Sequence, residues 1–294
     1  MTSLDPGSGE GNGTLRIAVP NKGSLAEPSR AILREAGYRQ RADHRELVLA
    51  DPDGGAEFFY LRPRDIAVYV GEGTLDLGIT GRDLLLDSGA HADEMLGLGF
   101  GGSRLRYAAP VGTFRAVAEL SGLRIATSYL GVVRRHLAAQ GVDASVIRLD
   151  GAVESAVRLG VADVIADVVE TGSTLRQAGL EIVGDPILES EAVLIRRSGA
   201  TDPAGYPVFL RRLQGVLVAR RYVMMDYDIP TDHLETACAI TPGIESPTVA
   251  PLHRDGWSAV RAMVLRERAQ QVMDELWEVG ARGILVTDIH ACRL

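Results

Sequence analysis

Two segments of the chain repeat one pattern of apolar and polar positions. Each opens with the apolar run LRIA, at Leu15 and again at Leu123, and passes through a short polar loop into apolar residues at helical spacing. Gly37 and Gly141 follow the two helical runs and suit the left-handed turn that often ends a helix. The pattern predicts two βα units of related plan.

A second pair of matching segments follows, one in each half. Residues 66–89 and residues 155–179 each predict a helix, a strand, a glycine-containing turn and another helix, with LDLGIT and ADVIAD as the strands. Continuous apolar strands between helices are typical of parallel sheets covered on both faces. We therefore predict two α/β lobes. Ligands in such folds bind beyond the carboxyl ends of the strands or between domains.

Between the two predicted lobes lies the glycine-rich stretch GLGFGG, residues 97–102. Its spacing matches the dinucleotide fingerprint GxGxxG, but SRLRYAAPV follows it, and this segment predicts a strand. The fingerprint needs a strand before the glycines and a helix after them. We therefore interpret 97–102 as a hinge or crossover between the lobes.

The last part of the chain predicts a different domain. RYVMMDYDI, SPTVAPL, WSAVRAMVL and GILVTDI have the composition of strands, with a short helix opening at Pro230 and Thr231 and an amphipathic helix over 266–280 between them. The order βαββαβ is that of a ferredoxin-like domain. We expect a disordered tail over 1–13, one lobe over 14–102 with about 190–210, a second lobe over 103–189, and a third domain over 211–294, with its boundary near Arg211.

Composition narrows the classes of function. The net charge of -8 argues against a nucleic-acid surface, which needs clustered Lys and Arg, but leaves anionic small molecules open. Cys238 and Cys292 form no CxxC motif and indicate neither a disulfide framework nor a thiolate metal site. The N-terminus lacks the basic start and apolar core of a secretory signal, and no apolar run approaches the roughly 20 residues of a membrane span. We expect a cytoplasmic protein that binds neither nucleic acid nor membrane.

The stretch DVVETGSTL contains the main candidate for a ligand site. An apolar strand ends there, and the candidate residues are Asp167, Glu170, Thr171, Gly172, Ser173, Thr174 and Leu175. Gly172 lets backbone N–H groups approach an anion, the hydroxyls are donors, and a helix beginning near Leu175 would add its partial positive charge. The two carboxylates would accept hydrogen bonds from sugar hydroxyls. An ordinary capped turn accounts for the same residues, so both interpretations stay open here.

Three other stretches also lie at predicted carboxyl ends of strands. PNKGSL offers Lys22 as a point charge for a phosphate and Gly23 as a backbone donor. GITGRDL offers Asp83, and LDGAVE offers Asp150 and Glu154. Taken singly, each is better explained as a solvated turn residue or a helix cap. Their convergence with 167–175 at strand ends is what favours a single anion-binding cleft.

No motif for covalent catalysis is present. The sequence contains neither GxSxG nor HExxH, and no GK[ST] follows the loop at 167–175. We therefore expect no catalytic nucleophile, and a chemistry of positioning and charge stabilisation.

Six stretches together resemble the ATP phosphoribosyltransferase family of histidine biosynthesis in its long form. They are LRIAVPNKGSL, LDLGITGRDL, RIATSY, LDGAVE, ADVIADVVETGSTL and ITPGIESPTVAPL, and the likeness runs from Leu15 to the end of the chain. The resemblance implies two lobes of the periplasmic-binding-protein kind with the active site between them, and a C-terminal regulatory domain that binds histidine. It also implies attack by N1 of ATP on C1 of phosphoribosyl diphosphate, release of pyrophosphate, a requirement for Mg²⁺, and a homo-oligomer that grows from dimer to hexamer.

Residue roles follow from the same resemblance. The loop 170–175 would hold the 5-phosphate of the phosphoribosyl group, with Asp167 at its entrance. Lys22 and Gly23 would line the nucleotide and pyrophosphate side, and the cleft-facing acids would be Asp83, Asp150 and Glu154. Histidine would bind at Asp228 and Thr248, with Glu245 and Ser246 nearby, because a carboxylate suits an amino or imidazolium group. The resemblance assigns no metal ligands.

One loop departs from the family pattern. The family usually has Pro-Asn after the Ser-Tyr of RIATSY, whereas Leu130 and Gly131 stand there in this chain. Arg134 and Arg135 follow, and we expect activity to survive the change.

Two other function classes share part of the pattern. A solute-binding protein would also have two lobes and a cleft, but the expected absence of a signal peptide and the third domain count against it. A regulatory subunit or transcription-factor sensor would need a helix-turn-helix segment or a basic patch, and the sequence shows neither.

Overall fold

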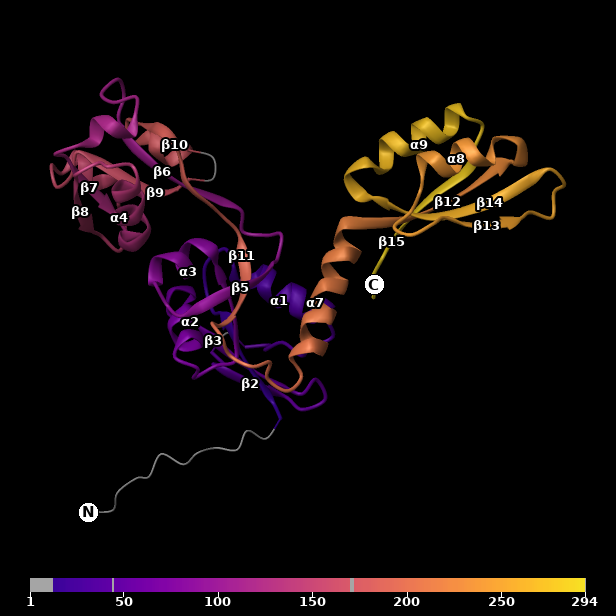
Figure 1. Ribbon diagram of the computed structural model, residues 1–294, viewed down its shortest axis with the longest axis horizontal. Coiled ribbons are helices and arrows are strands. Elements are labelled where there is room, and N and C mark those ends of the chain that lie inside the picture. Colours follow the sequence, from indigo (N-terminus) through magenta and orange to yellow (C-terminus); the bar gives the residue numbers. More distant parts are fainter. Residues whose placement is uncertain (1–12, 44, 170–171, 294) are drawn as a thin grey trace, which may run out of the picture. The chain divides into compact units, whose positions relative to one another are not determined.

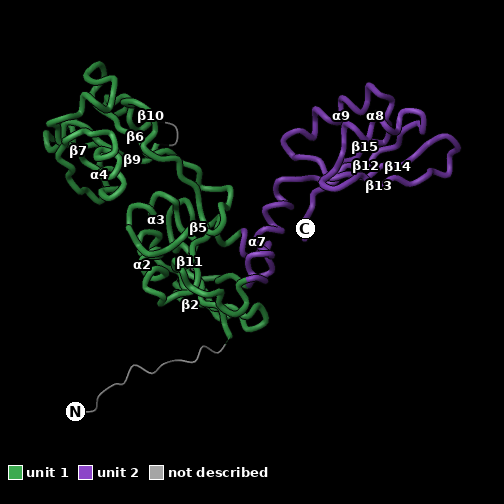
Figure 2. The backbone as a smooth tube through the Cα atoms, viewed as in Figure 1, with its two compact units in different colours: residues 1–31, 39–206 green, residues 32–38, 207–294 purple. Residues whose placement is uncertain are grey.

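The computed structural model describes residues 13–43, 45–169 and 172–293 (Figure 1). The tail predicted over 1–13 lies outside these ranges except for Gly13. The chain forms two compact units, residues 1–31 with 39–206 and residues 32–38 with 207–294 (Figure 2).

The first unit contains two lobes, each built on its own sheet. The sheet of lobe I has the order β2-β3-β1-β4-β11-β5. Its strands are β1 (Leu15–Pro20), β2 (Val48–Asp51), β3 (Ala56–Leu61), β4 (Leu77–Gly81), β5 (Ala92–Gly97) and β11 (Ala192–Arg197), and its helices are α1 (Ala26–Glu35), α2 (Pro63–Gly71) and α3 (Arg82–Ser88). The second half of α1 is counted with the other compact unit.

The sheet of lobe II has the order β10-β6-β9-β7-β8. Its strands are β6 (Ser103–Pro110), β7 (Arg124–Thr127), β8 (Ser145–Arg148), β9 (Val164–Val169) and β10 (Leu180–Ser190), and its helices are α4 (Leu130–Ala139), α5 (Ser155–Arg158) and α6 (Ser173–Gln177). On one face Ile125 packs with Val133 of α4, and on the other Ile165 packs with Leu175 of α6. Because both faces are covered, polar groups of the central strands reach ligands at the strand ends.

The sheets are mixed, whereas the apolar pattern predicted parallel ones. β1 pairs in parallel with β3 and β4, and β7 pairs in parallel with β8 and β9. The other pairings are antiparallel, because β2 and β3 form a hairpin and because the chain passes between the lobes twice. The first passage is the stretch 97–102, from β5 to β6, which confirms its interpretation as a crossover. The second passage, at Glu191, joins β10 to β11.

The second unit contains the predicted ferredoxin-like domain, preceded by a helix that the sequence pattern did not predict. That helix is α7 (Tyr206–Arg221), and the boundary expected near Arg211 falls inside it. The elements that follow are β12 (Tyr222–Pro230), α8 (Leu234–Ile240), β13 (Thr248–Pro251), β14 (Trp257–Leu265), α9 (Ala269–Glu278) and β15 (Arg282–Asp288). This order confirms βαββαβ, and the sheet order is β13-β14-β12-β15.

Helices α8 and α9 lie on the same side of this third sheet (Figure 1). Along β12, Tyr227 and Ile229 are buried in a core with Leu276 of α9, while the alternate residues Asp226 and Asp228 are only partly buried. The period of two thus separates a helix-covered face from an open face. In the described part of the chain, none of the helices is long and apolar enough to cross a membrane.

Candidate active site

A cavity of about 660 Å³, here called the inter-lobe cavity, is lined by strand-end loops of both lobes. Its walls are formed by Lys22, Arg62, Pro63, Arg64, Asp65, Leu84, Ser128, Arg148, Asp150, Gly151, Ala152, Val153 and Asp167. Three of the predicted site residues, Lys22, Asp150 and Asp167, are therefore brought together, although they lie after β1, after β8 and on β9. Carboxyl ends of strands from two facing lobes converge on one space.

Lys22 is the cation that β1 delivers to this cavity. It is the only lysine in the 294-residue sequence, which otherwise uses arginine for this class of cation. The next residue, Gly23, has a φ of +79°, so the loop takes a turn that side-chain-bearing residues rarely adopt. An ammonium group is a compact, strongly hydrated point charge with three donors, which suits a phosphate oxygen that moves during a reaction.

Asp167 is an acid of the cavity with a perturbed pKa. Burial raises the pKa of its carboxyl group, and the nearby charge of Glu154 raises it further. The hydrogen bond from the Val168 N–H to Oδ1, at 2.8 Å, acts in the opposite direction. Carboxyl groups with perturbed pKa values cluster in functional clefts, because burial and neighbouring charge set the protonation state that chemistry needs.

The loop after β9 turns at Gly172, which has a φ of +69°. Glu170 and Thr171 lie outside the described residues. Helix α6 begins at Ser173, two residues earlier than expected, and is only five residues long. Its aligned peptide dipoles are therefore few, and the expected contribution of a helix N-terminus to anion binding is smaller than the sequence suggested. Ser173 and Thr174 are exposed, whereas Leu175 is buried against the sheet.

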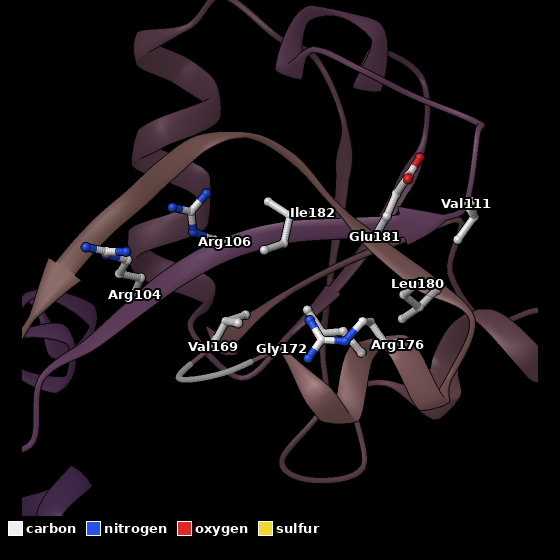
Figure 3. Close-up of a pocket in the computed structure, with 10 residues that line it drawn as sticks. Arg104, Arg106, Val111, Val169, Gly172, Arg176, Leu180, Glu181 and Ile182 are labelled. Atoms are coloured by element: carbon white, nitrogen blue, oxygen red, sulfur yellow. The ribbon is translucent and has the colours of Figure 1, made fainter.

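Gly172 opens on a second pocket, of about 570 Å³, on the α6 side of lobe II (Figure 3). Arg104 and Arg106 reach it from β6 and Arg176 from α6, over an apolar floor that includes Val169 and Ile182. The loop that resembles a phosphate-binding segment is therefore bordered by arginines on this side and by the inter-lobe cavity at Asp167. The sequence interpretation missed these arginines, because two of them lie inside a strand.

Asp83, expected to face the cleft, is buried and has hydrogen-bond partners within the protein. This residue is 7% exposed. Its Oδ1 accepts a hydrogen bond from Ser190 Oγ at 2.8 Å, and its backbone N–H donates to the same Ser190 Oγ at 3.0 Å. Tyr129 of lobe II also hydrogen bonds to Asp83, and burial, with the carboxylate beside it, raises the pKa of the tyrosine hydroxyl. These contacts join Asp83 of lobe I to side chains of lobe II, and Asp83 is not among the residues that line the inter-lobe cavity.

Other cavity residues were missed by the sequence interpretation. Arg62 and Arg64 follow β3 as Arg-Pro-Arg, with Pro63 at the first position of α2, where proline is favoured. The aromatic-rich segment AEFFYL could have predicted β3 and hence another strand end. Arg148 ends β8 and pairs with Asp150 at 3.2 Å. Ala152 has a φ of +46°, a left-handed conformation that nothing in the sequence indicates and that often accompanies functional sites.

The predicted histidine residues lie in the ferredoxin-like domain. Asp228 sits on the open face of β12, opposite Ala259 of β14 and Arg282 of β15. Thr248 starts β13 opposite Arg261 of β14, and Arg261 lies opposite Asp226 of β12, two residues before Asp228. Glu245 and Ser246 are exposed in the preceding loop. Asp228 and Thr248 thus lie on the same face of the sheet, and the histidine-binding role of the four residues stays a prediction.

Comparisons with known proteins agree with this architecture. The family profile described as ATP phosphoribosyltransferase matches residues 62–215, and the profile described as HisG, C-terminal domain, matches residues 219–291. ATP phosphoribosyltransferases of Paenarthrobacter aurescens and Streptomyces avermitilis are 64% and 63% identical to this chain, each over 95% of this chain and 100% of the relative. A chain of the ATP phosphoribosyl transferase (HisG:HisZ) complex from Thermotoga maritima matches with 29% identity and a TM-score of 0.58, over 69% of this chain and 98% of that chain. The chain therefore belongs to the ATP phosphoribosyltransferase family, in the long form that carries an additional C-terminal domain.

Proposed function

We propose that this chain transfers the phosphoribosyl group of phosphoribosyl diphosphate to N1 of ATP and releases pyrophosphate, the first step of histidine biosynthesis. The observation that carries the proposal is the inter-lobe cavity, which is lined by Lys22 and three arginines together with Asp150 and Asp167. Fixed cations stabilise a highly charged leaving group as its bond to C1 breaks. The protein needs no covalent nucleophile for this step, because the attacking nitrogen belongs to ATP.

The two ends of phosphoribosyl diphosphate then bind in different places. The loop that includes Gly172, Ser173 and Thr174 holds the 5-phosphate, which is remote from the reacting C1. Its binding energy orients the ribose toward the attacking nitrogen. Lys22 and Gly23 serve the nucleotide and pyrophosphate side, where charge develops.

Mg²⁺ is part of the proposal, and the residues present fit it. This ion prefers oxygen ligands, keeps several waters and is usually held by one or two carboxylates together with substrate phosphates. Asp150 and Asp167 line the cavity and would hold it there. When bound, the ion neutralises charge on the pyrophosphate group. The described residues contain no group of three or more His, Cys, Asp or Glu side chains placed to bind a metal, so substrate oxygens would complete the site.

The C-terminal domain supplies regulation in this proposal. Histidine binds on the open face of its sheet, with Asp228 and Thr248 as principal contacts and Glu245 and Ser246 nearby, and lowers the activity without competing at the cavity. The regulatory domain covers about 211–294, and the two catalytic lobes cover the rest of the chain after the tail. The active species is a homo-oligomer, from dimer to hexamer.

The test is a direct assay of the purified full-length chain. ATP, phosphoribosyl diphosphate and Mg²⁺ should give an adduct substituted at N1 of adenine, seen as a change in ultraviolet absorbance, with one pyrophosphate for each adduct. Omission of either substrate is the control. Absence of both adduct and pyrophosphate in the complete mixture would show that the chain is a binding or regulatory member of the fold.

A further inference from the structure

One carboxylate of lobe I caps a helix of lobe II. Asp87 lies at the end of α3, and its Oδ1 accepts hydrogen bonds from the N–H groups of Gly131, at 2.7 Å, and Val132, at 3.2 Å, in the first turn of α4. The N-cap residue of α4, Tyr129, contributes no side-chain cap. The first turn of a helix needs acceptors for its unpaired N–H groups. In this fold the other lobe provides one, and α3 packs against α4 (Figure 1).

The second oxygen of the same carboxylate holds a cation of the cavity. Asp87 Oδ2 lies 3.2 Å from Arg64 Nη1, and that nitrogen also donates to the carbonyl oxygen of Ser128 in lobe II at 2.8 Å. The Arg64 guanidinium carbon lies 5.3 Å from the centroid of the Tyr129 ring. The Asp87 side chain is 12% exposed, so solvent screens these interactions less than on an open surface. Arg64 itself lines the inter-lobe cavity.

Gly131 allows helices α3 and α4 to approach each other closely. A Cβ atom at this position would lie 2.5 Å from the carbonyl oxygen of Asp87. Its φ lies outside the left-handed region, so alanine would fit the backbone and would normally favour a helix. The glycine is therefore required by the neighbouring lobe and not by the conformation of α4.

We propose that Asp87 is a positioning residue that couples closure of the lobes to the placement of Arg64 in the inter-lobe cavity. When α4 docks on Asp87, one carboxylate caps the helix and fixes the guanidinium toward an anionic oxygen of the ligand. When the lobes separate, Arg64 loses both the Ser128 carbonyl and the ring of Tyr129. The inference rests on the proposed function only in taking phosphoribosyl diphosphate as the anionic ligand.

The contact itself is tested without any substrate, by hydrogen exchange of the Gly131 and Val132 amides in the full chain. Asp87→Ala should lower their protection, whereas Asp87→Asn should retain most of it, because an amide oxygen still accepts the hydrogen bonds. Gly131→Ala should also lower protection, although helix propensity alone predicts a firmer helix. Unchanged protection in both Asp87→Ala and Gly131→Ala would overturn the proposal.

The coupling to Arg64 is tested by the affinity for phosphoribosyl diphosphate, measured by calorimetry. Asp87→Ala should weaken binding about tenfold, the size expected for a lost cap and a misplaced charge. Asp87→Asn should weaken it by less. In the Arg64→Ala background, Asp87→Ala should cause little further loss of affinity. In the background of Arg62→Ala, a matched cavity arginine, it should cause nearly the same loss as in wild type. Additive losses with Arg64→Ala would overturn the positioning role.

These measurements separate two failures. If wild-type protein does not bind phosphoribosyl diphosphate, the proposed function fails, and amide exchange still decides whether Asp87 joins the lobes. If binding is normal in all Asp87 variants, the proposed function stands and the positioning role is wrong.

Discussion

The sheets of the lobes and the sheet of the C-terminal domain present polar residues in different places. In the lobes, β4 is buried at every position and β9 is buried through its first half, so Lys22, Asp150 and Asp167 appear where strands end. In the C-terminal domain, buried and partly buried residues alternate along β12, and Asp226 and Asp228 project from the middle of a strand. When both faces of a sheet are covered, polar functional residues are exposed only in the loops at the strand ends. When one face is covered, the other face can present them along the strands.

This difference determines how far the effect of a substitution spreads. A strand-end site depends on loop conformation and on the spacing of two lobes, so a local backbone change displaces several groups together. A site on an open sheet face depends on side chains whose backbone the sheet already holds, so each change is confined to one group.

Gly172→Val should cause the largest loss. Valine at a φ of +69° forces the loop into another conformation, and we expect kcat/KM to fall by about 100-fold or more. The Cβ itself would meet only ordinary contacts, the nearest at 3.5 Å from Arg176 Nη1, so the effect comes from the backbone. Steady-state kinetics with phosphoribosyl diphosphate measure it.

Gly122→Val is the matched control for that substitution. Gly122 also lies in lobe II with a φ of +77°, and a Cβ there would meet nothing within 4 Å. It should show similar backbone strain and a similar loss of thermal stability, with near-normal kcat/KM. Equal loss of activity in both variants would mean that lobe II tolerates no strained turn, and the special role of the 172 loop would be wrong.

Lys22 permits a chemical test because the chain has one lysine. Lys22→Ala should lower kcat/KM by about 30-fold, in the range of one charge-assisted hydrogen bond. An amine-reactive acylating reagent should inactivate wild-type enzyme, and phosphoribosyl diphosphate should slow the inactivation. Lys22→Arg keeps the charge and removes the reactive amine, so it is the control for labelling of the N-terminus. Continued inactivation of Lys22→Arg would place the reactive group elsewhere.

On the open sheet face, Asp228→Ala should change only the response to histidine. Loss of a charge-assisted hydrogen bond should raise the histidine concentration for half-inhibition about tenfold. Activity without histidine should stay near normal, because the substitution is confined to a surface of the C-terminal domain. Asp232→Ala, an exposed acid in the turn after β12, is the control. Unchanged sensitivity in Asp228→Ala would remove this residue from the histidine site.

Much of this contrast could be predicted from the sequence. The repeated LRIA runs and the period of two in RYVMMDYDI depend on local burial, so they indicate strands and faces directly. The antiparallel strands could not be predicted in the same way. Apart from the β2–β3 hairpin, their direction in the lobes follows from two crossovers between the lobes, which are properties of the whole chain.

The candidate site shows the same limit. Lys22, Asp150 and Asp167 follow apolar runs that predict strands, so their meeting at strand ends could be expected. Asp83 follows an equally good strand, yet the structure buries it, because Tyr129 and Ser190 come from elements that lie far away in sequence. Whether an acid meets ligand or protein is decided by such long-range partners.

The smallest effect concerns stability, and it should have opposite signs in the two regions. Burial raises the pKa of Asp167, so the folded protein retains a proton there more readily than the unfolded chain. Both states are protonated well below the ordinary aspartate pKa of about 3.9, and wild type then loses stability as the pH rises through the raised pKa. Asp167→Asn removes this loss while its amide oxygen keeps the hydrogen bond from Val168, so it should unfold at a higher temperature than wild type at pH 7 and at the same temperature near pH 3.

Asp226→Asn is the counterpart on the open sheet face. Asp226 forms an ion pair with Arg261 at 2.6 Å, and the Arg261 side chain is 63% exposed. Exposed ion pairs of this kind contribute about 0–1 kcal/mol to stability. Asp226→Asn should therefore lower the unfolding temperature slightly at pH 7, and added salt should reduce the difference. Thermal unfolding of both variants, followed by circular dichroism at the two pH values, measures the signs. If Asp226→Asn were more stable than wild type at pH 7, or if Asp167→Asn were less stable, the predicted difference between the two regions would be wrong.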